Sequence, residues 1–230
     1  DPWGTTAAGD IVKKFEDDFQ DDKGWTVSSD VSTGAWERVL PAGSSGGRCD
    51  APTDADSSGN AYVTGNAFDE DVDGGTTTLE SPDMDASEGG TLSYWRWYSN
   101  GSDCGGADSQ NDIFEVEASS DGGNTWYEVE TLGPTGSEVS GQWFQVNVDL
   151  DTLAGFTPSA NFRLRFICGD LNSGSVVEAA VDGVEIKITD CGVACQGDID
   201  GDGTVGISDF SFFLVDFGTS NPQSDFDGSG

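Results

Sequence analysis

Acids spaced like the ligands of a metal ion occur in residues 198–209, near the C-terminal end of the chain. This twelve-residue stretch has acids at its positions 1, 3, 5 and 12, and a glycine at position 6, where a chain that wraps an ion turns sharply. A hard cation such as calcium takes about six to eight oxygens, and a solvated Asp-Gly turn is the alternative. We favour calcium, because the acids recur at ligand positions and stop where a helix begins. The expected ligands are the side chains of Asp198, Asp200 and Asp202, the backbone carbonyl of Thr204 and the carboxylate of Asp209.

One amphipathic helix is expected directly after this loop, from Ser208 to Phe217, with Gly218 ending it. Between residues 196 and 230 the chain has seven Asp, no Glu and no basic residue. We therefore interpret residues 191–230 as a separate loop-helix module and residues 1–190 as one larger domain. The helix carries apolar residues at i, i+3, i+4 and i+7, namely Phe210, Phe213, Leu214 and Phe217.

A calcium loop followed by a single helix, with Asp at position 12, resembles a dockerin repeat, which is related to the EF-hand. In that family two such repeats pack together, bind one calcium each and dock into a cohesin domain of another protein. The first repeat here spans residues 198–218, and a partial second repeat spans residues 225–230. The resemblance implies calcium as cofactor. It also implies a cohesin-like partner, or neighbouring copies that complete the half loop in an oligomer or filament. The half loop offers Asp225, Asp227 and Ser229 at positions 1, 3 and 5.

The larger domain is expected to be mainly β, because short aromatic and β-branched runs alternate with turn signals such as Asp182-Gly183. No run of helical period and length interrupts them, so residues 1–190 are predicted to form an antiparallel jelly-roll-like β-sandwich. Residues 41–60 are predicted to form a long surface loop. The expected strands are 91–98, 113–118, 126–131, 144–150, 162–168, 176–181 and 184–189.

Several segments of this domain, among them 92–98, 120–126 and 177–182, resemble a β-sandwich domain that accompanies dockerin-like repeats in large secreted bacterial proteins. The resemblance implies a secreted or cell-surface protein and a structural calcium site of the kind that jelly rolls carry. Such a site joins an acid near the first strand to an acid in the last. The candidates are Glu16 or Asp17 with Asp182, and a loop with Asp71 and Asp73; solvated turn acids are the alternative.

The chain has 230 residues, 43 acids against 9 basic residues, a formal net charge of −34 and no histidine. Imidazole-based catalysis and histidine-ligated zinc are therefore excluded for this sequence. A surface this acidic is also repelled by nucleic acid and by anionic membranes, and no apolar run is long enough to insert into a bilayer. Folding is expected to depend on divalent cations that neutralise part of this charge.

Five cysteines suit an oxidising compartment and leave one unpaired. Cys168 is in phase with the apolar residues of its strand, so we expect it in the core as a free thiol. Cys191 and Cys195 are close enough to form one disulfide, with zinc binding as the alternative, and Cys49 and Cys104 could form another.

Aromatic residues support a second hypothesis, in which the sandwich is a carbohydrate-binding module or an accessory domain of a larger secreted hydrolase. Trp95 and Trp126 would then stack against sugars, although Trp in a core poor in Leu and Ile is the simpler explanation. Paired carboxylates for hydrolysis are not indicated, so we predict no enzyme. The first hypothesis is a non-catalytic extracellular calcium-binding protein that assembles through its tail.

Overall fold

The computed structural model describes residues 10–43, 48–67, 70–100, 104, 111–171, 174–190 and 207–216. Residues 13–187 form one compact unit, and residues 1–12 with 188–230 form another. In the second unit the described tail is helix α1 (Ile207–Asp216), which agrees with the predicted helix to one residue at each end. Several predicted residues lie outside the described ones: Cys191, Cys195, Asp198, Asp200, Asp202, Thr204, Asp225, Asp227 and Ser229.

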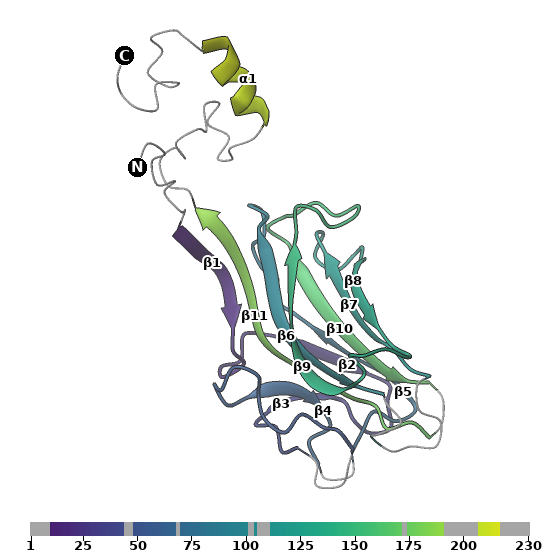
Figure 1. The fold of residues 1–230 in the computed structure, drawn as a ribbon. Helices are drawn as coiled ribbons and strands as arrows, with labels where there is room; N and C mark the ends of the chain where they lie inside the picture. The colour runs from purple at the N-terminus through teal and green to yellow at the C-terminus, as the bar shows by residue number, and fades with distance from the viewer. Residues whose placement is uncertain are drawn as a thin grey trace. The chain divides into compact units, whose positions relative to one another are not determined.

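Two antiparallel sheets build the larger unit, which confirms the predicted β-sandwich (Figure 1). Sheet A has the order β3 (Trp36–Val39), β4 (Ala61–Thr64), β11 (Glu178–Asp190), β6 (Thr91–Ser99) and β9 (Ser140–Asp149), with β1 (Asp10–Asp17) also paired to β11. Sheet B has the order β2 (Thr26–Ser29), β5 (Gly75–Glu80), β10 (Arg163–Asp170), β7 (Phe114–Ser119) and β8 (Tyr127–Leu132). Most consecutive strands lie in different sheets, a winding typical of jelly rolls.

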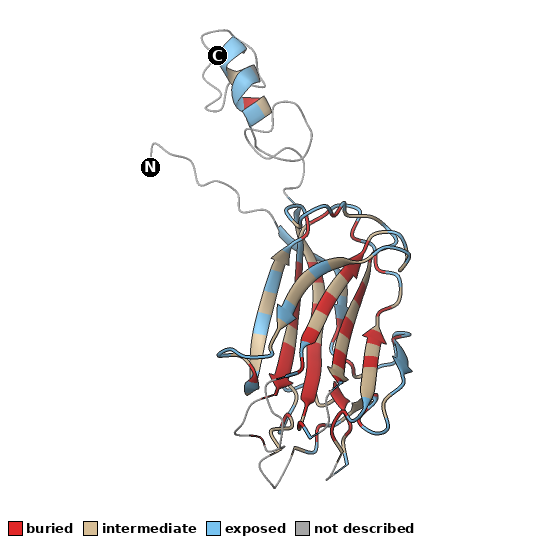
Figure 2. Ribbon diagram, turned by 90° about the vertical axis from the view of Figure 1, so that its right-hand side faces the viewer, coloured by how far each residue is buried: buried red, intermediate tan, exposed pale blue. Residues whose placement is uncertain are grey.

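Aromatic side chains fill the space between the sheets, where the buried residues of the strands concentrate (Figure 2). Phe166 of β10 lies at the centre, with its ring 5.3 Å from that of Tyr94 and 6.3 Å from that of Phe114. Cys168 follows Phe166 on the same face and is a fully buried free thiol, as predicted. The large rings supply the apolar area that a sandwich with few Leu and Ile needs.

Strand β11 differs from the prediction. The sequence suggested two strands with a turn at Asp182-Gly183, whereas the structure has one strand with a register shift between Asp182 and Glu185. Gly183 has a φ of +55°, which a glycine adopts without steric strain, so the chain bulges there and continues. The bulge changes the direction of the strand at the residue that the sequence singled out as a metal ligand.

A disulfide joins Cys49 and Cys104, as predicted. Cys49 lies near the start of residues 48–60, which contain no helix or strand and connect toward β4. The predicted surface loop is therefore present in this stretch, and it is tethered covalently at one end. Among the described residues, no helix is long and apolar enough to cross a membrane.

Buried polar groups lie beneath the start of this loop, where Arg48 forms an ion pair with Asp71 and lies 3.7 Å from Glu178. Glu178 is 2% exposed, and its Oε1 atom has no hydrogen-bond partner. The pKa of Glu178 is raised to about 11, chiefly by burial and in addition by the neighbouring acids Asp50 and Asp71, while Arg48 opposes the rise. Glu178 is therefore a protonated, neutral acid across the physiological pH range.

Replacing Glu178 with Gln should make the protein more stable at alkaline pH. Between the unfolded pKa near 4.5 and the folded pKa of about 11, the native state holds a proton that the unfolded chain releases, so stability falls as pH rises. The amide of the variant stays neutral in both states. Thermal unfolding at pH 8.5 should show a midpoint about 3 °C or more above that of the original chain, with little difference near pH 5.

The matched control is Glu128→Gln, because Glu128 is an exposed acid of β8. This variant should follow the original chain at every pH. Parallel midpoint curves for Glu178→Gln and the original chain would contradict a protonated Glu178.

Candidate functional site

Three carboxylates gather where residues 54–56 approach the bulge of β11. Each of Asp54, Asp56 and Asp182 offers one oxygen, and these oxygens lie within 4.8 Å of one another. Asp182 is fully buried, whereas Asp54 is half-buried and Asp56 is exposed. Three carboxylate oxygens at this separation can share one hard cation, with water filling the remaining vertices.

Backbone N–H groups hold the Asp182 carboxylate in place. Its Oδ2 atom accepts hydrogen bonds from the amides of Ala55 (2.7 Å) and Asp56 (3.3 Å). Its Oδ1 atom accepts one from Gly183 (2.8 Å). The Asp182 side chain therefore fixes the backbone of the loop that carries Asp54 and Asp56.

The loop acids are fixed from within the loop. Oδ2 of Asp54 accepts a hydrogen bond from the amide of Gly59, and Oδ1 of Asp56 accepts one from Ser58, both at 2.8 Å. Ser57, between them, has a φ of 68°, which is costly for a residue with a side chain. Each of these bonds uses one oxygen of its acid and orders the loop around it.

The electrostatics of this group favour a bound cation. The pKa of Asp182 is raised to about 7: burial is the main cause and the charge of Asp56 adds to it, while the three backbone hydrogen bonds act in the opposite direction. Among the described residues, none of the three acids forms an ion pair with Lys or Arg. A divalent cation would remove the repulsion between the acids and restore the charged form of Asp182.

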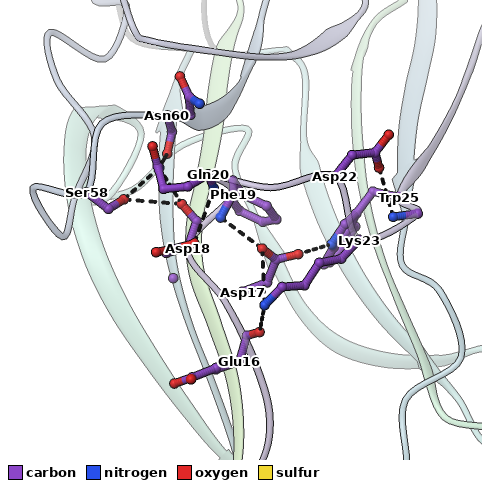
Figure 3. A network of polar contacts seen from close by, with 12 residues as sticks. Glu16, Asp17, Asp18, Phe19, Gln20, Asp22, Lys23, Trp25, Ser58 and Asn60 are labelled. Carbon is purple, nitrogen blue, oxygen red and sulfur yellow. Dashed lines mark hydrogen bonds and ion pairs between the residues drawn. The ribbon is translucent and has the colours of Figure 1, made fainter.

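The loop between β1 and β2 supports the same region (Figure 3). The Gln20 side chain donates to Ser58 Oγ at 2.9 Å and to the carbonyl of Asn60 at 3.2 Å, and Ser58 Oγ in turn donates to the carbonyl of Asp18. Phe19, fully buried between Asp18 and Gln20, has a φ of 58°. The two loops are thus linked by hydrogen bonds beside the three acids, and both contain a residue with strained backbone.

Asp17, a sequence candidate for this calcium site, has other partners. Its oxygens accept hydrogen bonds from the amide of Phe19 (2.9 Å) and from Nε1 of Trp25 (2.8 Å), and Lys23 lies 3.9 Å away (Figure 3). Glu16, the other candidate, binds Lys13 at 2.5 Å. The structure therefore brings the predicted Asp182 together with two loop acids that the sequence interpretation did not select.

A signal for Asp54 and Asp56 was present in the sequence. In residues 54–59 an acid at positions 1 and 3, a hydroxyl at position 5 and glycine at position 6 repeat the spacing used to identify residues 198–209. Gly59 has a φ of +130°, as the turn at position 6 requires. The stretch has no acid at position 12; Asp182 of β11 instead places its carboxylate beside those of Asp54 and Asp56.

The remaining predicted acids are placed apart from this group. The carboxylate of Asp71 pairs with Arg48, while exposed Asp73 accepts a hydrogen bond from Thr33 Oγ1 at 3.3 Å. Asp209 of α1 is buried, and its predicted co-ligands lie outside the described residues.

A surface hollow of about 510 Å³ is lined in part by Asp56, one of the three acids. Its wall includes Asp56, Gly183 and the partly buried Trp95, and exposed Gln145 faces Trp95 across the pair β6–β9. The rest of the lining is charged: Lys13, Glu16, Asp17, Asp18, Asp21, Lys23 and Glu185. An indole, an amide and carboxylates in one hollow can stack against a ring and hydrogen-bond hydroxyl groups.

The tryptophans suggested by the sequence do not form one platform. Leu92 and Tyr94 of β6 are buried in the core between the sheets. Trp95 alternates with them along the strand, so it lies on the outer face of sheet A. Trp126 precedes β8 of sheet B, and the guanidinium of Arg165 lies 4.1 Å from the centre of its ring. Only Trp95 lines the hollow.

Neither a protein-family model nor a curated protein matches the chain. Among solved structures, the K1 cleaved adhesin domain of Lys-gingipain from Porphyromonas gingivalis W83 is 18% identical, with a TM-score of 0.48 over 77% of this chain and 98% of that one. The K2 cleaved adhesin domain of Lys-gingipain is 19% identical, with a TM-score of 0.48 over 76% and 99%. A family 11 carbohydrate-binding module from Clostridium thermocellum, in complex with a mixed-linked tetrasaccharide, is 14% identical, with a TM-score of 0.41 over 78% and 96%. These similarities concern the fold alone.

Proposed function

We propose that the sandwich is a non-catalytic extracellular binding module in which calcium fixes the loops around a glycan-binding hollow. The observation that carries this proposal is the position of Trp95, partly exposed in a polar hollow that is also lined by Asp56, one of the three clustered acids. A calcium ion on these acids would hold the loop of residues 54–60 against β11 and fix one side of the hollow. The disulfide Cys49–Cys104 is consistent with an extracellular location.

Binding is a better account of the hollow than hydrolysis. A glycoside hydrolase needs one carboxyl group that stays protonated near neutral pH, opposite a second that is ionised. Burial opposes the ionisation of Glu185, but hydrogen bonds with Lys13 and Lys187 lower its pKa overall. Burial raises the pKa of Asp17, but its oxygens accept hydrogen bonds from Phe19 and Trp25, which hold it in a structural contact. These acids are therefore committed to structural contacts, and we propose no catalytic role for them.

Calcium should raise the unfolding temperature of the sandwich, and Asp182→Asn should abolish most of that increase. A ligand at a hundred times its dissociation constant stabilises by about 2.7 kcal/mol, which corresponds to roughly 5–10 °C for a domain of this size. The variant keeps the shape of the side chain but loses its charge, so the increase should fall below about 2 °C. Differential scanning calorimetry in calcium and in chelator measures both values.

Asp73→Asn is the control for this test, because Asp73 is an exposed acid outside the cluster. It should leave the calcium-dependent increase unchanged. Equal increases in the original chain and in Asp182→Asn would refute the calcium site on β11.

Replacement of Trp95 by Ala should abolish glycan binding. Removing an indole that stacks on a ligand costs on the order of 2 kcal/mol or more, which is at least about thirtyfold in affinity. Glycan-array binding with the original chain identifies the ligand, and titration of both proteins measures the loss. Trp126→Ala is the matched control and should bind normally, since Trp126 lies on sheet B against Arg165. The proposal fails if the array shows no binding by the original chain, or if both variants lose binding equally.

We also propose that the tail mediates assembly. The support comes from the spacing of the acids in residues 198–209 and from α1, whose apolar side chains Phe210 and Leu214 are 54% and 58% exposed. Exposed apolar side chains on a short helix are costly unless another surface covers them. A cohesin-like protein or another copy of this chain would supply that surface.

If the tail assembles through calcium, chelation should disperse the assemblies. Light scattering in calcium is expected to show oligomers or larger particles, and these should fall to the size of a 24.0 kDa chain in chelator. A variant with Asp198, Asp200 and Asp202 changed to Asn should be monomeric in both conditions. Particle size that is the same with and without calcium would argue against assembly through the tail.

A further inference from the structure

A second, smaller apolar cluster lies on the outer face of sheet A. Trp97 is 8% exposed there, and its ring lies 5.7 Å from that of Trp143, edge to face. The other members are Ala51, Val63 and Ala180, with Val39 at the margin. Ala51 belongs to the loop of residues 48–60, so the loop is packed onto the sheet through this cluster.

Both indoles also bind the backbone of the loop. Nε1 of Trp97 donates to the carbonyl of Cys49 at 2.8 Å, and Nε1 of Trp143 donates to the carbonyl of Thr53 at 2.9 Å. Thr53 directly precedes Asp54, the first acid of the cation site. The position of Asp54 is therefore fixed by a hydrogen bond one residue away, from a strand of the sheet.

The start of the loop is fixed by close packing as well as by its disulfide. A side chain at Gly141 would place its Cβ atom 3.1 Å from the carbonyl oxygen of Cys49 and 3.1 Å from the ring of Trp97. Gly141 has a φ of +75°, so glycine suits both the conformation and the close approach. Cys49 itself has a φ of 68°. This strained start is held by Cys104, Trp97 and the neighbouring strand β9 together.

We infer that Trp143 is a positioning residue for the cation site, and that with Trp97 and the Cys49–Cys104 disulfide it clamps the loop so that Asp54 is preorganised for calcium. This inference rests on the calcium site proposed above. The indole of Trp143 does not belong to the three-carboxylate group; it acts through the Thr53 carbonyl. Without the clamp, the loop would have to become ordered when the ion binds, and the entropy lost in this step would weaken the affinity for calcium.

Trp143→Phe tests the clamp, because phenylalanine keeps an aromatic ring in the cluster and removes the N–H donor. The experiment uses the full chain with Asp198→Asn and Asp200→Asn in the tail, so that calcium binding reports on the sandwich. Isothermal titration with calcium chloride should show affinity weakened by about three- to tenfold, the effect expected from one hydrogen bond. The calcium-dependent rise in unfolding temperature should shrink correspondingly.

Trp126→Phe, in the same background, is the matched control and should bind calcium like the parent chain. A merely structural role for Trp143 would lower the unfolding temperature equally with and without calcium and would leave the affinity unchanged; that result overturns the clamp while the calcium site stands. Failure of the parent chain to bind calcium overturns both proposals. Weakened affinity in Trp143→Phe with an unchanged control supports the clamp.

Discussion

The buried carboxylate of Asp182 is the constraint on which the outer side of sheet A depends. Its oxygens bind the amides of Ala55, Asp56 and Gly183, so it joins a loop to a strand 127 residues further along the chain. A fully buried charge next to two other acids is unfavourable unless a positive charge offsets it. The bulge of β11, the strained backbone at Ser57 and the loop itself all serve to hold this group together.

Trp95 and Trp97 lie on the same face of β6, but the loop of residues 48–60 gives them different roles. Trp97 lies beneath the loop and binds its backbone, whereas Trp95, two residues earlier, lies beyond the loop and lines the hollow. Alternation along a strand places both on the same face but does not determine which is covered. The loop of residues 48–60 determines which of the two indoles is covered. The path of this loop depends on the disulfide at Cys49 and on the two loop acids that lie beside Asp182.

The sequence patterns predicted those features that depend on residues close together in the chain. The alternation around Cys168 placed that thiol in the core, and the period of residues 208–217 placed α1 within one residue. The pairing of Cys49 with Cys104, which the sequence offered as a possibility, is present. Contacts between distant segments were harder: alternation gives the face of a residue but not its partner strand, so Trp126 and Trp95 were grouped although they lie on different sheets. Asp54 and Asp56 were missed because the third acid of their group, Asp182, lies on β11, far from them in the sequence.

Two buried acids on β11 show how a chain with 43 acids and 9 basic residues can still bury carboxyl groups. Glu178 lies beside Arg48 and Asp71, takes a proton and becomes neutral. Asp182 lies beside two further acids, the half-buried Asp54 and the exposed Asp56, whose oxygens suit a hard cation. Since lysine and arginine are too few to pair with most acids, protons and divalent cations are the remaining counter-charges. Their neighbours distinguish the two acids: Glu178 lies against the buried Asp71 and is neutral, whereas Asp182 adjoins the exposed Asp56, through which the proposed cation would reach it.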